Sequence, residues 1–337
     1  MVAKKQTKHI DVENRKVKLS SKASKKNKKI LVSIIMPTYN RAHCILDSVA
    51  SVLKQDTDST NLNWELIISD DASTDDTESL FAKSKNLDPR IIYFRASKNG
   101  GVNVARNLAI KRAHGDYVLF LDSDDFLTSD AFNILSQYLP STQKILLFST
   151  NEVATSNLMT HVSNDAAYTY RQWLEAKDVN GEFLSVVDAA VFSKDMFDEE
   201  RFCFESFFWN RIVKKYGVFA SSKVLREYSF SSDNRVSKKL SDPAYAARRF
   251  KDYIVYIQRF GIDYRDADLL DLLANLYAKT SLFGILGGQK KEALLYLKQS
   301  FSIKRTGFGV CVCFFSLIPR PLDVFVYKII HKMMNIQ

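Results

Sequence analysis

The sequence predicts an α/β fold in which a mostly parallel sheet is flanked by helices and followed by a C-terminal helical region. Up to residue 125, short apolar β-branched runs alternate with segments whose apolar residues recur at helical spacing. The 337 residues, 46% of them hydrophobic and 26% charged, have the composition of a globular protein with a substantial core. Strands that alternate with helices form parallel sheets with helices on both faces.

The elements follow in chain order. The first strand, residues 30–36, ends at Pro37, and apolar residues from Ile45 to Leu53 then recur at helical spacing. Three helices in the C-terminal region are expected near residues 244–260, 267–284 and 290–300. The other expected strands cover residues 64–69, 91–95, 117–121 and 145–149, and the other helices residues 75–84 and 102–113.

Charge and composition divide the chain into parts. Residues 4–29 contain eleven Lys and Arg against two acidic residues, so this segment supplies +9 of the net charge of +10. Residues 1–29 have few apolar side chains and are expected to form a disordered basic tail. The nearly neutral remainder argues against a cleft that binds nucleic acid. We expect a catalytic domain over residues 30–242, in halves 30–126 and 127–242, and a helical region over residues 243–337.

The cysteines and apolar runs indicate the compartment. Cys44 and Cys203 are isolated, and Cys311 and Cys313 lack a second pair of ligands, so a zinc site is not expected. Free thiols and a tail without an apolar signal sequence fit the cytoplasm. The longest apolar run, residues 307–318, is about half as long as a membrane-spanning helix. Residues 307–334 mix aromatic and basic side chains, typical either of an interfacial segment on an anionic membrane or of a packed terminal helix.

Three carboxylates within four residues follow the strand at 117–121. They are Asp122, Asp124 and Asp125. Like charges this close repel one another unless a cation lies among them, and carboxylate oxygens suit Mg²⁺ or Mn²⁺ held jointly with phosphate oxygens. The alternative is a solvated acidic turn before the helix expected near Ser129.

A second acidic group, from Asp70 to Asp76, also follows a strand directly. Ser73 or Thr74 could cap the next helix, and Asp75 or Asp76 would complement its dipole. Capping leaves Asp70 and Asp71 unexplained. A carboxylate there could accept hydrogen bonds from a nucleotide base or a ribose hydroxyl.

A glycine pair, Gly100 and Gly101, precedes the helix expected at residues 102–113, with Arg106 one turn inside it. Glycines allow a ligand to approach the backbone at a helix N-terminus, so an anion site is one interpretation. A plain turn followed by a surface arginine is the other.

These motifs, in this order and after successive strands, resemble glycosyltransferase family 2, whose fold is called GT-A. The resemblance covers residues 30–125 and rests on residues 32–40, 70–75, 101–107 and 115–125. It implies that Asp71 contacts the base, Asp122 the ribose side, Asp124 a Mn²⁺ or Mg²⁺ ion, and Arg106 the donor or its diphosphate. Pro37, Tyr39, Asn40 and Ser123 are assigned to the nucleotide site with them.

The resemblance also implies a reaction. Such enzymes invert the anomeric centre in one displacement, which needs a base for the acceptor proton. The family often supplies it from a Glu-Asp pair, but here Ser206 stands where the Asp is expected. Glu205 is therefore the candidate base, with Asp188 second. Trp173 and Trp209 either stack on a sugar ring or belong to the core.

The expected function is transfer from a nucleotide-sugar, with UDP the family's common nucleotide, to a glycan or lipid-linked glycan acceptor. We expect it in polysaccharide synthesis in the cytoplasm, with a peripheral membrane contact at the inner face. The alternative is a GT-A-like protein that binds a nucleotide-sugar without transferring it, motivated by Ser206. A nucleic-acid binder would rest only on the tail, which lacks interleaved aromatic residues.

Overall fold

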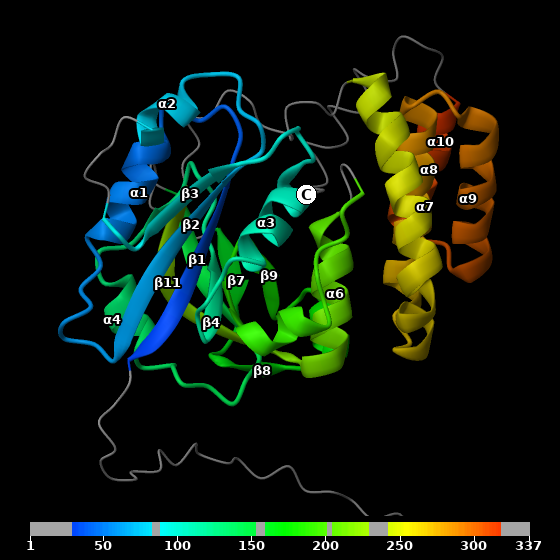
Figure 1. Ribbon diagram of the computed structural model, residues 1–337. Helices are drawn as coiled ribbons and strands as arrows, with labels where there is room; N and C mark the ends of the chain where they lie inside the picture. Colours follow the sequence, from blue (N-terminus) through cyan, green and yellow to red (C-terminus); the bar gives the residue numbers. More distant parts are fainter. Residues whose placement is uncertain (1–28, 83–87, 153–158, 201–203, 229–241, 318–337) are drawn as a thin grey trace, which may run out of the picture.

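The computed structural model describes residues 29–82, 88–152, 159–200, 204–228 and 242–317. The first half contains the predicted alternation of strands and helices (Figure 1). The predicted tail lies outside the described residues except for Lys29, as does the end of the predicted helix at Ser84. The elements are β1 (Ile30–Thr38), α1 (Ile45–Leu53), β2 (Leu62–Asp70), α2 (Thr77–Ala82), β3 (Ile91–Arg95), α3 (Val102–Ile110) and β4 (Tyr117–Phe120).

The second half extends the same sheet. Among the described residues the sheet has nine strands in the order β3-β2-β1-β4-β10-β6-β11-β5, with β8 paired to β11. The β1, β2, β3 and β4 pairings are parallel, whereas β10 runs antiparallel between β4 and β6. The elements are β5 (Phe126–Leu127), α4 (Ala131–Leu135), β6 (Ile145–Glu152), β7 (Thr160–Val162), β8 (Ala166–Tyr168), α5 (Tyr170–Glu175), β9 (Val179–Gly181), β10 (Leu184–Asp188), a 3-10 helix (Ala189–Ser193), α6 (Glu205–Tyr216) and β11 (Val218–Tyr228).

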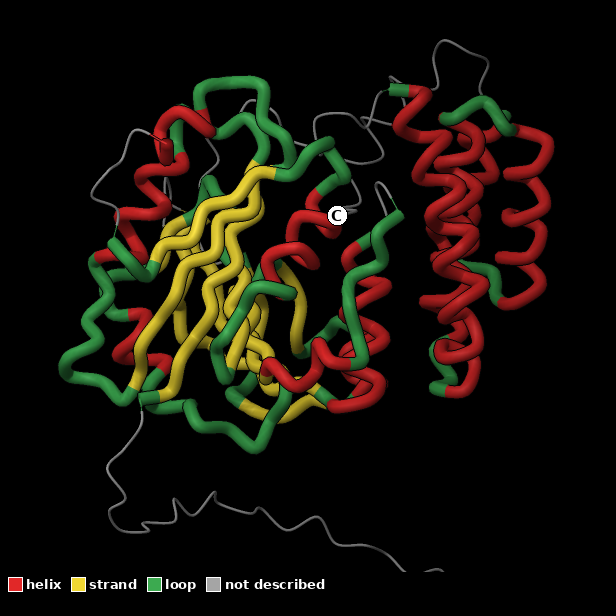
Figure 2. The backbone as a smooth tube through the Cα atoms, viewed as in Figure 1, coloured by secondary structure: helices red, strands yellow, loops and turns green. Residues whose placement is uncertain are grey.

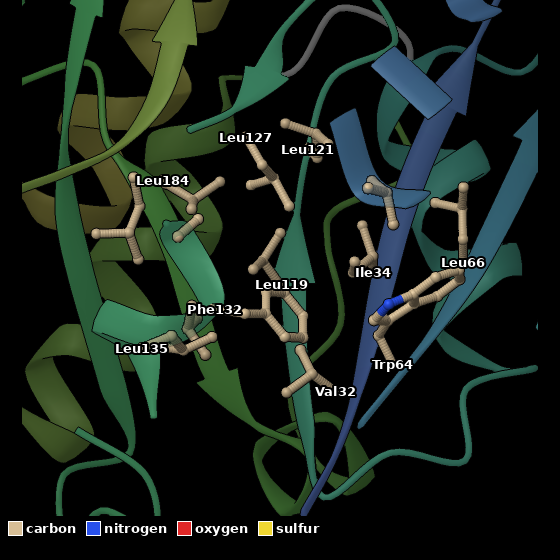
Figure 3. Packing of buried hydrophobic residues seen from close by; sticks show 14 of the residues in the cluster. Val32, Ile34, Trp64, Leu66, Leu119, Leu121, Leu127, Phe132, Leu135 and Leu184 are labelled. Atoms are coloured by element: carbon tan, nitrogen blue, oxygen red, sulfur yellow. The ribbon is translucent and has the colours of Figure 1, made fainter. Parts of the chain in front are cut away.

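Helices cover both faces of the sheet (Figures 1 and 2). Because successive side chains of a strand point to opposite faces, Val32 and Ile34 of β1 pack on the α1 side. That core is shown in Figure 3, where Trp64 and Leu119 lie beside them. Ile35 points to the opposite face, whose core includes residues of α3 and α6.

The carboxyl ends of the parallel strands meet at one edge of the sheet. Thr38 at the end of β1 pairs with Asp70 at the end of β2, and Asp70 pairs with Arg95 at the end of β3. The backbone N–H of Leu121, just after β4, donates to the carbonyl of Ile35. The motifs that follow these strands therefore lie together, where open α/β sheets bind their ligands.

The C-terminal helices are α7 (Pro243–Asp266), α8 (Leu270–Leu286), α9 (Lys290–Ile303) and α10 (Gly307–Ser316). The three predicted helices are confirmed. Together they form a bundle beside α6 (Figure 1). They share a core with the sheet domain, because Tyr256 and Phe260 of α7 pack on Phe207 of α6. Tyr256 also accepts a hydrogen bond from Asn210 at 2.6 Å. The domain boundaries stay predictions.

Helix α10 is the described part of the segment predicted to be either interfacial or packed. Val312 and Phe315 are buried against the neighbouring helices, whereas Phe314 is 68% exposed and Leu317 is 73% exposed. Residues 318–334 of that segment lie outside the described residues. No helix in the described ranges is long and apolar enough to span a membrane.

Candidate active site

Three arginines accompany the three carboxylates that follow β4. Asp125 is 1% exposed, so the alternative of a solvated acidic turn is wrong for this residue, whereas the side chains of Asp122 and Asp124 are 42% and 21% exposed. Guanidinium groups from other parts of the chain offset part of the repulsion among these carboxylates, and a bound cation at Asp124 stays a prediction. The pairs are Asp122 with Arg106 at 3.0 Å, Asp124 with Arg41 at 3.3 Å, and Asp125 with Arg226 at 3.4 Å.

Arg106 is a buried cation between two carboxylates. It is 5% exposed, so the interpretation as a surface arginine is wrong. Nη2 lies 3.0 Å from Oδ1 of Asp122, and Nη1 lies 2.5 Å from Oε1 of Glu205. Burial alone would lower the pKa of Arg106, but Glu205 and Asp122 raise it above its ordinary value. Arg106 therefore stays charged and links the motif after β4 to helix α6.

Asp122 is ionised for a related reason. Burial would raise the pKa of its carboxyl, but Arg106, and after it Arg226, hold the pKa below its usual value. A fixed negative charge thus lies at the end of β4, in a position to accept hydrogen bonds from a ligand.

A cavity of about 440 Å³ opens beside this pair. It contains predicted residues from both halves of the chain, Asp122 and Arg106 from the first and Glu205 from the second. Trp173 and Trp209 also line it while packing against the core around α6, so the core interpretation is confirmed and stacking on a sugar ring stays a prediction. The remaining lining residues include Phe120, Leu147, Glu182, Phe183, Ser185, Ser206 and Arg226.

Glu205 is the first residue of α6, and 46% of its side chain is exposed. Its partner is Arg106, whereas Arg211 of the same helix pairs with Asp198 at 2.8 Å. The second candidate base, Asp188, pairs with Lys144 at 2.6 Å and lies in register with Tyr117 at the start of β4. Asp188 is therefore at the opposite edge of the sheet from Asp122.

Asp71 holds the glycine turn. It is 3% exposed, and its two carboxylate oxygens accept hydrogen bonds from the backbone N–H groups of Gly100 and Gly101, both at 2.7 Å. Gly101 has φ of 93°, a conformation that favours glycine. A Cβ at Gly100 would lie 2.8 Å from Cγ1 of Val104. The glycine pair is thus required by the turn, and contact of Asp71 with a base stays a prediction.

The remaining nucleotide-site candidates lie at the same sheet edge, outside the lining of the cavity. Asn40 has φ of 54°, and its Oδ1 accepts from the backbone N–H of Thr74 at 2.7 Å. Tyr39 is 42% exposed, whereas Pro37 is buried within β1. Ser123 is buried, and its carbonyl accepts from the hydroxyl of Ser48 at 3.0 Å. These contacts order the loops after β1 and β4.

Asp124 is suited to a hard cation by its chemistry and position. Its carboxylate is 21% exposed and has Arg41 beside it. Across the described ranges, no group of three or more His, Cys, Asp or Glu side chains is placed to hold a metal ion. An ion at Asp124 would therefore take its other ligands from substrate phosphates and water, as Mg²⁺ commonly does.

Two residues of the cavity, Glu182 and Arg226, were not found from the sequence. Glu182 lies in the loop between β9 and β10, and Arg226 lies on β11, in a region where the sequence shows little alternation. The polar pattern of Asn180, Gly181 and Glu182 resembles any surface turn. The one signal in the sequence that could have pointed to Arg226 was Asp125, the third carboxylate after β4, because a carboxylate in such a cluster needs a cation beside it.

The chain is similar in sequence to a known family and to known transferases. The family model described as Glycosyl transferase family 2 matches residues 33–198. A Campylobacter jejuni protein, GalNAc(5)-diNAcBac-PP-undecaprenol beta-1,3-glucosyltransferase, is 28% identical over 86% of this chain and 94% of its own length. An Escherichia coli protein, UDP-Glc:alpha-D-GlcNAc-diphosphoundecaprenol beta-1,3-glucosyltransferase, is 37% identical over 38% of this chain and 48% of its own.

Two solved structures are similar in fold. Staphylococcus aureus TarS 1-349, in complex with UDP-GlcNAc, has a TM-score of 0.53 at 20% identity, covering 86% of this chain and 81% of that one. The mannosyltransferase PcManGT of Pyrobaculum calidifontis, in complex with GDP-Man and Mn²⁺, has a TM-score of 0.53 at 17% identity, covering 91% and 88%. The fold is thus of the GT-A type, as predicted. The chain belongs to glycosyltransferase family 2 and is a glycosyltransferase.

Proposed function

We propose that this enzyme transfers one sugar from a nucleotide-sugar, with UDP as the nucleotide, to a sugar hydroxyl of a lipid-linked glycan. The observation that carries the proposal is the cavity in which Arg106 joins Asp122, from the motif after β4, to Glu205 at the start of α6. The C. jejuni and E. coli relatives are both named for acceptors on undecaprenol diphosphate. The product would be an intermediate of polysaccharide or glycan synthesis.

The donor is proposed to bind along the carboxyl edge of the sheet. The residues proposed to surround the nucleoside lie after β4 and at or just after the ends of β1 and β2: Asp122, Ser123, Pro37, Tyr39, Asn40 and Asp71. Asp124 would hold a Mn²⁺ or Mg²⁺ ion, which supplies positive charge against the diphosphate when bound. Arg106 would add a second positive charge next to Asp122.

The acceptor is proposed to enter the cavity from the side of α6. Trp173 and Trp209 offer apolar faces for a sugar ring, while the carboxylates can accept hydrogen bonds from its hydroxyl groups. The acceptor oxygen would attack the anomeric carbon from the face opposite the diphosphate, which inverts that centre. The lipid part would require a membrane surface nearby, so we propose a cytoplasmic enzyme in peripheral contact with the inner face.

Mass spectrometry of products tests this proposal. The full chain is incubated with Mn²⁺, a panel of nucleotide-sugars and a synthetic glycan attached to polyprenyl diphosphate. The expected result is an acceptor heavier by one sugar with one donor of the panel. If a donor binds the protein but stays intact, the result would support the alternative of a nucleotide-sugar-binding protein without transfer activity. Ser206 motivates that alternative.

Asp71→Ala is expected to weaken donor binding and to destabilise the protein at the same time. The substitution leaves the N–H groups of Gly100 and Gly101 without their carboxylate, at a cost of about 1–3 kcal/mol for each group that stays unsatisfied. Calorimetric titration with UDP beside a thermal melt measures both effects. Unchanged affinity in a destabilised variant would show that Asp71 supports the turn without contacting the base.

Glu205→Gln is expected to lower kcat by about 10²- to 10⁴-fold if Glu205 is the base, the usual range for general acid–base catalysis. The melting temperature and the affinity for donor would then be unchanged. If Glu205 serves to hold Arg106, both would fall with activity, because the 2.5 Å ion pair is lost. Measuring kcat, donor affinity and melting temperature on one preparation distinguishes the two roles.

A further inference from the structure

Glu182 is a third carboxylate in the lining of the cavity, besides Asp122 and Glu205. It follows β9, and its backbone N–H donates to the carbonyl of Met159 at 3.2 Å. The preceding Gly181 has φ of 107°, and a Cβ there would lie 2.2 Å from the same carbonyl oxygen. Only glycine fits, so the backbone holds Glu182 at a defined place in the cavity wall.

The carboxylate of Glu182 has a more distant cationic partner than the carboxylate of Glu205. Glu205 lies 2.5 Å from Arg106, whereas Glu182 lies 3.7 Å from Nη2 of Arg226. Arg226 also pairs with Asp125 at 3.4 Å, and its Nε donates to the hydroxyl of Thr150 at 3.1 Å. Among the described residues no hydrogen bond to the carboxylate of Glu182 is seen, and 62% of this side chain is exposed. Glu182 thus remains available to a hydroxyl group in the cavity.

The charges around Glu182 also suit proton transfer. Although the side chain is open to the cavity, the surrounding protein displaces part of the water around its carboxyl and raises its pKa above the ordinary value. Arg226 acts in the opposite direction, Glu205 and Asp122 raise the pKa further, and Arg106 lowers it. A carboxylate with a raised pKa holds a proton more readily near neutral pH, as a general base must.

We propose that Glu182 takes the proton from the acceptor hydroxyl, while Glu205 positions Arg106. The inference rests on the proposed transfer reaction. In one step the acceptor O–H bond breaks and its proton goes to the carboxylate of Glu182. The acceptor oxygen bonds to the anomeric carbon of the donor, the bond from that carbon to the phosphate oxygen breaks, and the electron pair leaves with the nucleoside diphosphate. Ser206, an unactivated hydroxyl, has no part in the proton transfer.

Glu182→Gln tests the proposal, because glutamine keeps the size of the side chain but cannot take the proton. We expect kcat to fall by about 10²- to 10⁴-fold with donor affinity and melting temperature unchanged. In the wild type the rate should fall as the pH drops through the pKa of Glu182, because the protonated carboxyl is inactive. The variant should lose this acidic limb, which a merely structural role would leave in place.

Two companions complete the experiment. Glu205→Gln is expected to reduce donor affinity together with activity and to keep the acidic limb. Glu292→Gln, at an exposed position of α9, is the matched control and should behave as the wild type. If Glu182→Gln keeps a near-normal kcat while the wild type is active, the inference about Glu182 is wrong and the proposed function stands. A wild-type chain that binds donor and forms no product would instead overturn the proposed function.

Discussion

Asp124→Ala is expected to lower transfer activity by about 10²-fold or more while leaving the protein folded, since a metal ion stabilises transferring charge by several kcal/mol. The fold should survive because the carboxylate of Asp124 is partly exposed and its described partner is the equally accessible Arg41. Turnover is measured over a range of Mn²⁺ concentrations, and high concentrations should not restore the activity.

The matched control is Asp130→Ala. Asp130 lies six residues further along the same segment, is exposed, and makes no side-chain cap of α4. It should keep wild-type turnover and the same dependence on Mn²⁺. Wild-type activity in Asp124→Ala would show that this carboxylate does not hold the ion.

Arg106→Leu is expected to affect stability and activity together. The substitution leaves Asp122 and Glu205 without their shared cation. Removing one partner of a fully buried ion pair costs about 3–5 kcal/mol, and because these carboxylates are partly exposed we expect about 2 kcal/mol. Loss of one preorganised donor at the site of charge should lower kcat/KM by about 10²- to 10³-fold.

Two comparisons isolate the role of the guanidinium in Arg106. Arg106→Lys keeps the charge but cannot reach two carboxylates with a planar fork, so it should recover only part of the stability. Arg112→Leu, an exposed position beyond the end of α3, should leave both quantities near wild type. Denaturant unfolding and initial rates measure the effects. If Arg106→Leu is as stable and as active as the wild type, Arg106 is not needed to hold Asp122 and Glu205 or to stabilise charge during transfer.

Local patterns were sufficient to predict the first half of the fold. Strand β3 matches its predicted bounds, and β1, β2 and β4 differ by a few residues, because each is an apolar run followed by a polar or glycine-containing segment. The antiparallel strand β10 was not predicted. It pairs with β4 and β6 through contacts distant in sequence, and its five residues carry no local signal for that place.

The residues of the site, like the strands, were predicted only where a local motif marks them. Asp122, Arg106 and Glu205 were predicted from motifs, and the structure brings them into one cavity. The pairings of Arg41 and Arg226 with the carboxylates after β4 join residues at least 83 positions apart in sequence, so no local pattern could reveal them. Glu182 escaped prediction for the same reason, because only the arrangement of β9 and β10 carries it into the cavity.

The measurement that tests the central claim most directly is the stoichiometry of one reaction. The full chain is supplied with a radiolabelled UDP-sugar, Mn²⁺ and a glycan on polyprenyl diphosphate, and the labelled acceptor and the released UDP are quantified together. Transfer through the cavity that joins Asp122, Arg106 and Glu205 predicts equal amounts of the two products, and both formed about 10²- to 10³-fold more slowly in Arg106→Leu at the same protein concentration. Donor that binds without releasing UDP, or UDP released without labelled acceptor, would contradict it.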